Sequence, residues 1–264
     1  MITTARANPA SRQILVNLGN RFVVFGPEGS LPEPLHFDPK DSPVLPRVAD
    51  ESEGAERRIA ETLQIVGMSR ATPPPNVVNG PDVCLVDAAG KRILIDIKVR
   101  ERDPKARDYE AANKQLLDMG AGNEIPEIWF FNIERLKLVV LRLDNGHLRI
   151  DELAPLNVWE KTENSLFERS QVIEEVADWS RRVERLYADV REWLTDVDNL
   201  RFDLSRSVTM SEELMQQFAV TDRELAILDV LRGDQVLASF VPRGLWLIGA
   251  WGRVDVITNK NSFV

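Results

Sequence analysis

The sequence predicts an α/β fold in which a helix, three strands, a second helix and a further strand follow one another, with a mainly α-helical region after them. Residues 79–100 contain two apolar runs of strand length, and 127–132 contain another. Amphipathic helical patterns at 51–66 and 105–119 enclose the first pair of strands. A helical pattern of about thirty residues at 165–194 predicts the helical C-terminal region.

The pair of strands within 79–100 turns at Ala89-Gly90 and carries an unusual pattern of charge. Side chains alternate between the two faces of a strand, so Asp96 and Lys98 share one face of the second strand. The other face is aliphatic. Asp82, just after Pro81 at the start of the preceding strand, is placed to supply a second carboxylate beside Asp96.

Two close carboxylates on an otherwise apolar strand need a compensating charge, because buried charges are costly unless they are paired or bound to metal. Oxygen ligands favour a hard divalent cation such as Mg²⁺, which keeps several waters and takes ligands from substrate phosphates. Lys98 would then point toward the same phosphate. The hairpin therefore predicts a site for Mg²⁺ and a phosphate group.

Pro81-Asp82 followed by Asp96-Ile97-Lys98 resembles the signature of the PD-(D/E)xK nuclease superfamily, over roughly residues 51–145. The resemblance implies a restriction-endonuclease-like αβββαβ core, with a mixed central sheet flanked by helices. It implies that Asp82, Asp96 and the backbone carbonyl of Ile97 hold Mg²⁺, with Mn²⁺ able to substitute. Lys98 would position the attacking water or stabilise the transition state. The middle acid is Asp here, where Glu is commoner in the family, which leaves the number of metals open.

In that family an acid on the helix before the strands often reaches the metal. Glu56 lies on the apolar face of the 51–66 helix, and we take it as the candidate for this further, water-bridged ligand. Glu53, at the margin of the face, is the second choice. The alternative is that Glu56 forms an ion pair with Arg57 or Arg58.

Gln115, on the 105–119 helix, resembles a glutamine that some branches of the superfamily place facing the active site. The resemblance implies that it orients water or substrate. The alternative is an ordinary exposed glutamine.

The net charge of −9 argues against a protein that coats phosphates along its whole surface. The segment from Lys98 to Arg107 is locally positive, and we predict that nucleic acid contacts it there. The candidate nucleic-acid-binding residues are Arg100, Arg102, Lys105 and Arg107. The alternative is a solvated loop of mixed charge.

The predicted divisions are an N-terminal hairpin with a Pro-rich linker (1–50), the nuclease core (51–155) and the C-terminal region (156–264). Gly19-Asn20 between apolar runs predicts the first hairpin, and Asp144-Asn145-Gly146 predicts another around 136–150.

In the C-terminal region, Ser165 and Glu168 resemble a capping box at the start of the long helix. That helix either packs against its own chain or supplies the contact for a homodimer or a partner protein. Two shorter helices are expected near 211–218 and 221–231, the second opening at a Thr221-to-Glu224 capping box. The aromatic tail then forms a terminal strand pair, as in a small DNA reader or an interaction surface.

Several classes are excluded by composition. Cys84 is the only cysteine, so no disulfide framework exists, and His36 with His147 cannot make a zinc cluster. The sequence contains neither a signal peptide nor an apolar run of membrane-spanning length, and it contains no Gly-rich nucleotide-binding loop. We therefore expect no nucleotide cofactor and a cytoplasmic location.

The leading hypothesis is thus a Mg²⁺-dependent nuclease, a DNA endonuclease of restriction, phage-defence, transposition or repair type. The second hypothesis is a catalytically inactive, nuclease-derived DNA-binding or assembly subunit of a larger complex. The negative charge and the large C-terminal region favour the second, and the presence of all motif residues favours the first.

Overall fold

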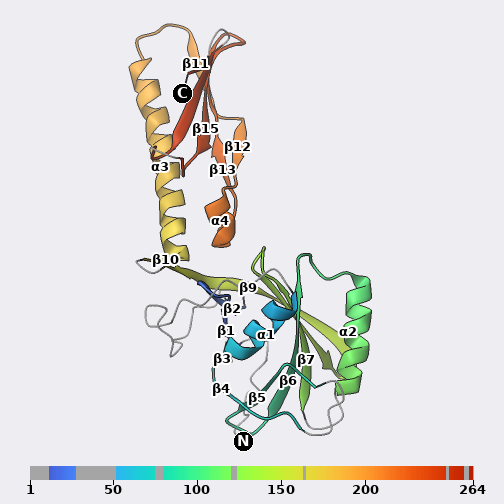
Figure 1. Cartoon of the computed structure of the whole chain (residues 1–264). Coiled ribbons are helices and arrows are strands. Elements are labelled where there is room, and N and C mark those ends of the chain that lie inside the picture. Colours follow the sequence, from blue (N-terminus) through green and yellow to red (C-terminus); the bar gives the residue numbers. More distant parts are fainter. Residues whose placement is uncertain are drawn as a thin grey trace, which may run out of the picture. The chain divides into compact units, whose positions relative to one another are not determined.

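The computed structural model describes residues 12–27, 52–74, 80–119, 124–162, 165–247, 250–258 and 262–263 (Figure 1). Most of the predicted Pro-rich linker lies outside these residues. The chain divides into two compact units, residues 1–168 (unit 1) and 169–264 (unit 2). The single boundary thus lies at 168/169, whereas the sequence analysis placed boundaries at 50/51 and 155/156.

The predicted fold class is wrong. The described residues form seventeen strands and four helices, and both units are built mainly on β-sheet. Unit 1 contains a ten-stranded mixed sheet rather than a small αβββαβ core, and unit 2 contains a five-stranded sheet where a mainly helical region was expected.

Along the chain of unit 1, strands precede the first helix, separate the two helices and follow the second. Its elements are β1 (Ile14–Asn17), β2 (Arg21–Gly26), α1 (Ser52–Thr62), β3 (Gln64–Ile65), β4 (Met68–Arg70), β5 (Val83–Asp87), β6 (Arg92–Arg100), α2 (Ala106–Met119), β7 (Ile125–Asn132), β8 (Lys137–Asp144), β9 (His147–Lys161) and β10 (Leu166–Glu168). The strand order is β3-β1-β2-β9-β8-β7-β6-β5-β4, with β10 paired to β9. Only β6 and β7 are described as a parallel pair, and α2 connects them.

The long strand β9 explains why the sheet is larger than the sequence predicts. β9 continues past Pro155, where the sequence suggests an end, and pairs with β2 as well as β8. Proline is tolerated in a sheet at irregularities of pairing, and the β2–β9 register shifts between Val24 and Phe25, whose partner is Pro155. The N-terminal hairpin thereby becomes part of the same sheet.

The sheet curls so strongly that its two ends approach each other. β3 and β4 are at opposite ends of the strand order, yet only Val66 and Gly67 separate them in the chain. Phe25 of β2 and Phe131 of β7 meet edge to face across the concave side, with ring centroids 5.7 Å apart, although β9 and β8 lie between their strands. Figure 1 shows α1 on this inner side.

Both predicted hairpins with short turns are confirmed. β1 pairs with β2, and Gly19 has the positive φ of 101° that the tight turn requires. β8 pairs with β9 across Asn145 and Gly146, whose φ values of 51° and 79° are those of a hairpin turn with two left-handed residues.

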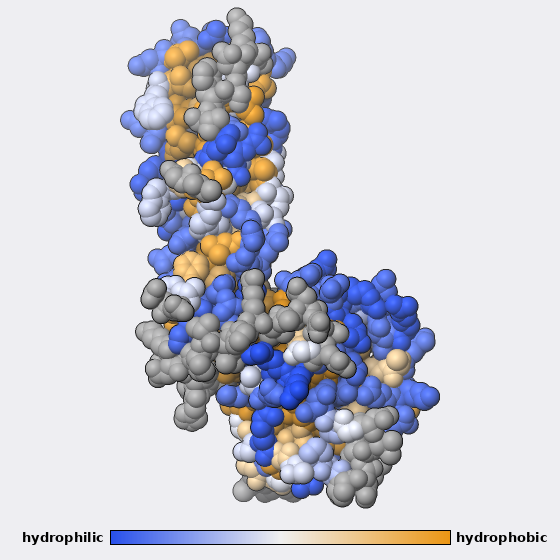
Figure 2. All heavy atoms as spheres, viewed as in Figure 1, coloured by the Kyte–Doolittle hydropathy of each residue, from blue (hydrophilic) through white to orange (hydrophobic). Residues whose placement is uncertain are grey.

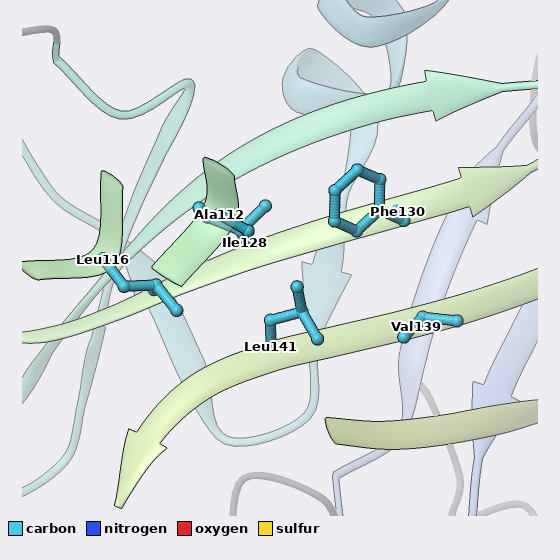
Figure 3. Packing of buried hydrophobic residues seen from close by; sticks show 6 residues of the cluster. All are labelled: Ala112, Leu116, Ile128, Phe130, Val139 and Leu141. Carbon is cyan, nitrogen blue, oxygen red and sulfur yellow. The ribbon is translucent and has the colours of Figure 1, made fainter. Parts of the chain in front are cut away.

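The two helices cover opposite faces of the sheet around β6 and β7. Ala55 and Ile59 of α1, and Leu63 directly after its end, recur every fourth residue and are almost fully buried, and α1 contacts β6 and β1. On α2, Ala112 and Leu116 pack over β7 and β8, as Figure 3 shows. The cluster on this face consists of Ala112, Leu116, Ile128, Phe130, Val139 and Leu141.

Unit 2 consists of one long helix on a sheet, with a small β-ribbon beside it. Its elements are α3 (Arg169–Trp193), β11 (Leu200–Asp203), β12 (Ser207–Met210), α4 (Glu213–Gln217), β13 (Arg223–Ala226), β14 (Leu228–Arg232), β15 (Gln235–Gly244), β16 (Arg253–Thr258) and β17 (Ser262–Phe263). The sheet order is β11-β14-β15-β16-β17, and β12 pairs with β13. The aromatic tail contributes β16 and β17, as the expected strand pair.

The long helix α3 is confirmed, and one face of it packs against its own chain. Val176, Val183 and Val190 are buried on that face, and Trp179 lies so close to Gly252 that a Cβ at position 252 would come within 2.3 Å of its ring. Gly252 also has a φ of 117°, which side chains disfavour. The predicted capping box is absent, because Glu168 belongs to β10 and accepts a hydrogen bond from the indole of Trp159.

The expected short helix near 211–218 is found as α4, but the helix expected at 221–231 is wrong. That segment forms β13 and β14. Glu224 does not cap a helix, since its carboxylate instead accepts hydrogen bonds from the hydroxyls of Ser207 and Thr209 on the neighbouring strand. Short apolar runs of this length fit either structure, and pairing with β12 and β15 decides for strand.

We expect Tyr187→Phe to lower the free energy of unfolding by about 1 kcal/mol at neutral pH. The Tyr187 hydroxyl on α3 donates toward the carbonyl oxygens of Ala226 and Phe240, at 2.7 Å and 3.1 Å, and so ties the helix to two strands. Burial raises the pKa of Tyr187 to about 12. Urea unfolding followed by Trp fluorescence measures the change, and an unchanged midpoint would show that the hydroxyl contributes nothing.

The surface seen in Figure 2 is mainly hydrophilic over the part of unit 1 where Figure 1 places α2, and apolar residues show as separate patches elsewhere. Within the described residues, no helix combines the length and the apolar character needed to cross a membrane.

Candidate active site

The predicted site lies on β6, and the alternation of its side chains is as expected. Ile95 and Ile97 point to the inner side and are completely buried. Leu94, two positions before Asp96, packs against Met119 of α2, so Asp96 and Lys98 face α2. The sequence therefore places these two charged side chains beneath a helix rather than in open solvent.

Two carboxylates satisfy the backbone of β6 where its neighbour ends. β5 pairs with β6 only as far as Val83, opposite Ile95, so the edge of β6 beyond that point has no partner strand among the described residues. Asp82 Oδ2 accepts a hydrogen bond from the Ile97 amide at 2.7 Å, and Glu56 Oε1 accepts one from the Val99 amide at 2.9 Å. Each carboxylate thus takes the place of a missing strand carbonyl.

This edge also presents a backbone carbonyl. In a strand, the amide and the carbonyl of one residue point to the same side, so the Ile97 carbonyl lies on the side that Asp82 occupies. Val83 lies opposite Ile95 in the antiparallel β5–β6 pair. If the pairing continued by one residue, Asp82 would lie opposite Asp96. The structure therefore brings Asp82, Asp96 and the Ile97 carbonyl to one place.

Asp96 and Lys98 form a close ion pair. Lys98 Nζ lies 2.6 Å from Asp96 Oδ2, and only 6% of Asp96 is exposed. Asp96 is therefore a buried carboxylate whose charge is compensated by Lys98.

The environment raises the pKa of Asp82 above its ordinary value. Partial loss of water around the carboxylate is the largest cause, although the residue is exposed, and the negative charge of Asp96 acts in the same direction. The Ile97 amide and Lys98 act in the opposite direction. Asp82 and Asp96 therefore interact as like charges, which is the condition that a divalent cation relieves.

A pocket of about 480 Å³ lies between β6 and α2. The predicted residues Asp96, Lys98 and Gln115 line it together. Gln115 thus faces the site and is not an ordinary exposed glutamine. The remaining lining residues are Gly80, Ala111, Lys114, Asp118 and Met119.

Lys114 and Asp118 were not predicted. They lie one position before and three positions after Gln115, so the helical period puts all three on the same side of α2. Extending the candidate set along the face of Gln115 would have found them.

Glu56 approaches the site from α1. It pairs with neither Arg57 nor Arg58 as the alternative supposed: Arg57 instead pairs with Glu61 at 3.0 Å, and Glu56 lies 3.6 Å from Arg100. Its carboxylate is anchored by the Val99 amide, two residues along β6 from the contact of Asp82. The side chain of Glu53 lies outside the described residues.

The four basic residues of the predicted patch divide into two pairs. Arg100 lies over the ring of Phe130 at 5.9 Å and close to Glu56, and Arg102 bonds the carboxylate of Asp108 at 2.7 Å. The latter contact, with the amide of Lys105, lowers the pKa of Asp108 to about 2. Lys105 and Arg107 are exposed at the start of α2.

No group of three or more His, Cys, Asp or Glu side chains stands ready to bind a metal ion within the residues that the structure describes. Two carboxylates that repel each other and a carbonyl at a free strand edge fit the ligand chemistry of Mg²⁺, which completes its coordination with water and substrate. The residues present therefore suit a cation held by two side chains.

Comparison with known proteins found no matching protein-family model, no matching curated protein and no matching solved structure.

Proposed function

We propose that this protein is a metal-dependent nuclease that hydrolyses phosphodiester bonds, acting as a DNA endonuclease. The observation that carries the proposal is the meeting of Asp82, Asp96 and Lys98 at the unpaired end of β6, beside a pocket. The proposal rests on this site alone, because the same chemistry can occur on unrelated folds.

Asp82, Asp96 and the Ile97 carbonyl are the groups that would hold Mg²⁺, with Mn²⁺ as a substitute and Glu56 as a water-bridged fourth contact. When bound, such a cation neutralises charge on the scissile phosphate and lowers the pKa of a coordinated water. The backbone bonds of Asp82 and Glu56 fix these two carboxylates before any ligand arrives.

The other residues of the pocket act on the substrate. Hydrolysis joins the oxygen of water to phosphorus, breaks the bond to the leaving sugar oxygen, and yields a phosphate monoester and a hydroxyl. Lys98, held beside Asp96 by their ion pair, donates hydrogen bonds to the additional negative charge of the transition state. Gln115 orients the water or the phosphate from the opposite wall.

The test is cleavage of supercoiled plasmid, single-stranded DNA and branched DNA in Mg²⁺ or Mn²⁺. We expect nicked or linear products from the wild-type chain, none in the presence of EDTA, and none from Asp96→Ala. Circular dichroism of Asp96→Ala checks that the variant is folded.

A second candidate is a nuclease-derived DNA-binding or assembly subunit without activity. Asp82 and Glu56 accept hydrogen bonds from the β6 backbone, and this structural role favours the second candidate. The role would require both residues even in a protein without catalysis. Binding of DNA by the wild-type chain, with no cleavage of any of the three substrates, would decide for this candidate.

A further inference from the structure

The α2 wall of the pocket carries a lysine, Lys114, that has no role in the proposed hydrolysis. Lys114 lines the pocket across from Asp96 and Lys98, and no carboxylate pairs with it in the part of the chain that the structure describes. Glu110 and Asp118 each lie four residues from it along α2, but neither forms an ion pair with it. An exposed lysine with a free ammonium group at a pocket rim can bind an anion at little cost in desolvation.

The proposed substrate supplies the anion that Lys114 would bind. Lys98 is paired with Asp96 at 2.6 Å, whereas Lys114 stands on the opposite wall without an ion pair to any described residue, on the same wall as Asp118. A nucleic-acid strand whose scissile phosphate lies at Lys98 brings a further phosphate within the same open pocket, because every nucleotide of a strand carries one. Lysine binds phosphate as a point charge and needs no fixed geometry.

The neighbouring face of α2 leaves room for a strand. Ala111 lies one turn before Lys114 and also lines the pocket, so the neighbour of Lys114 on the pocket wall is a methyl group. Arg107 and Glu110 are exposed further back on α2. Side chains on a helix lean toward its N-terminus, so Lys114 leans toward Ala111. The ammonium group of Lys114 therefore has a small neighbour on the pocket wall and stays accessible to a strand.

We propose that Lys114 binds the backbone phosphate next to the scissile one on the same DNA strand, and so sets the position of the substrate in the pocket. This role rests on the proposed nuclease function. Lys114 is a substrate-binding residue in this view and takes no part in bond breaking.

The test is the salt dependence of DNA binding. A fluorescein-labelled duplex is titrated with Asp96→Asn and with Asp96→Asn/Lys114→Gln, the first substitution being present to prevent cleavage. Losing one phosphate contact should reduce the slope of log K against log salt by about 0.9 and weaken binding about eightfold at about 0.1 M salt. Lys114→Arg should retain the slope, because its charge is kept.

Lys91 supplies the matched control. It is an exposed lysine just before β6 at the distant turn of the same hairpin, and Lys91→Gln should change neither the slope nor the affinity. In cleavage assays, Lys114→Gln should raise KM about eightfold with kcat within about twofold of wild type.

The outcomes separate the two proposals. Wild-type cleavage together with an unchanged salt slope in Lys114→Gln would overturn the role of Lys114 and leave the nuclease standing. DNA binding whose slope falls in Lys114→Gln, with no cleavage by wild type, would refute hydrolysis and support the phosphate contact. Absence of any DNA binding would overturn both.

Discussion

Lys98→Ala is expected to slow DNA cleavage by about 100- to 1,000-fold, the usual effect of removing one donor that stabilises charge in a transition state. Among the described residues, Lys98 is the only basic side chain that lines the pocket from β6, and 30% of its side chain is exposed, so it can reach both Asp96 and a phosphate. The effect should fall mainly on kcat, because the extra charge that Lys98 contacts exists only in the transition state.

A structural explanation for the same loss must be separated from a catalytic one. Removing Lys98 leaves Asp96 buried without its closest positive charge, which destabilises the fold. Lys98→Arg keeps the charge and controls for this effect, and the urea midpoint of each variant is measured beside its kcat. Lys91→Ala, at the far turn, should cleave within about twofold of wild type. Cleavage by a folded Lys98→Ala at more than about a third of the wild-type rate would remove Lys98 from the mechanism.

The local parts of the structure could be predicted from the sequence because short-range rules determine them. The β5–β6 hairpin, the strand β7 and the helix α3 follow from apolar periodicity, and the two turns at Gly19 and Gly146 follow from the residues that tolerate positive φ. The same rules placed Asp96 and Lys98 on one face.

The global parts could not be predicted because they depend on pairings between distant segments. β2 pairs with the second half of β9, more than a hundred residues away, and no local signal near Pro155 indicates that the strand continues. In unit 2, Thr221 and Glu224 have the spacing of a capping box, but the cross-strand hydrogen bonds of Glu224 override it.

The sequence predicted only part of the candidate site, because the rest depends on where strands and helices meet in the folded protein. The acids could be assigned to their elements, but the point at which β5 ends is set by tertiary structure, so the sequence did not reveal that Asp82 and Glu56 bond the amides of Ile97 and Val99. Lys114 was missed because only Gln115 was selected on its side of α2, although the helical period places Lys114 and Asp118 on that side as well.

Asp82→Asn is expected to reduce cleavage to about 1% of wild type or less while making the metal-free protein more stable. The loss of activity follows from removing one of two carboxylate ligands, which costs several kcal/mol of charge stabilisation in such sites. The gain in stability follows from the pKa of Asp82, which partial desolvation and the charge of Asp96 raise above its ordinary value. A carboxyl group whose pKa is raised on folding favours the folded state when protonated, and this contribution is lost as the pH rises through the folded pKa. At pH 7 the ionised Asp82 therefore opposes folding, and a neutral amide does not.

The Asp82→Asn substitution should preserve the local structure, because the side-chain oxygen of an amide can still accept the hydrogen bond from the Ile97 amide. Thermal unfolding is measured with EDTA and with Mg²⁺. In EDTA the variant should have the higher Tm, and the difference should vanish as the pH is lowered below about 4, where the wild-type carboxyl is protonated in both states. Mg²⁺ at about ten times its Kd should stabilise the wild type by about 1.4 kcal/mol and leave the variant unchanged.

Two outcomes would contradict this account of Asp82. An equal Mg²⁺ response in both proteins would remove Asp82 from the metal site. A lower Tm of the variant in EDTA would show that the charge of Asp82 stabilises the fold, through a contact with the β6 backbone that an amide cannot replace. Because the first outcome concerns the cation and the second concerns the backbone contact, the two measurements separate the catalytic role of this carboxylate from its role as a substitute for the missing strand carbonyl.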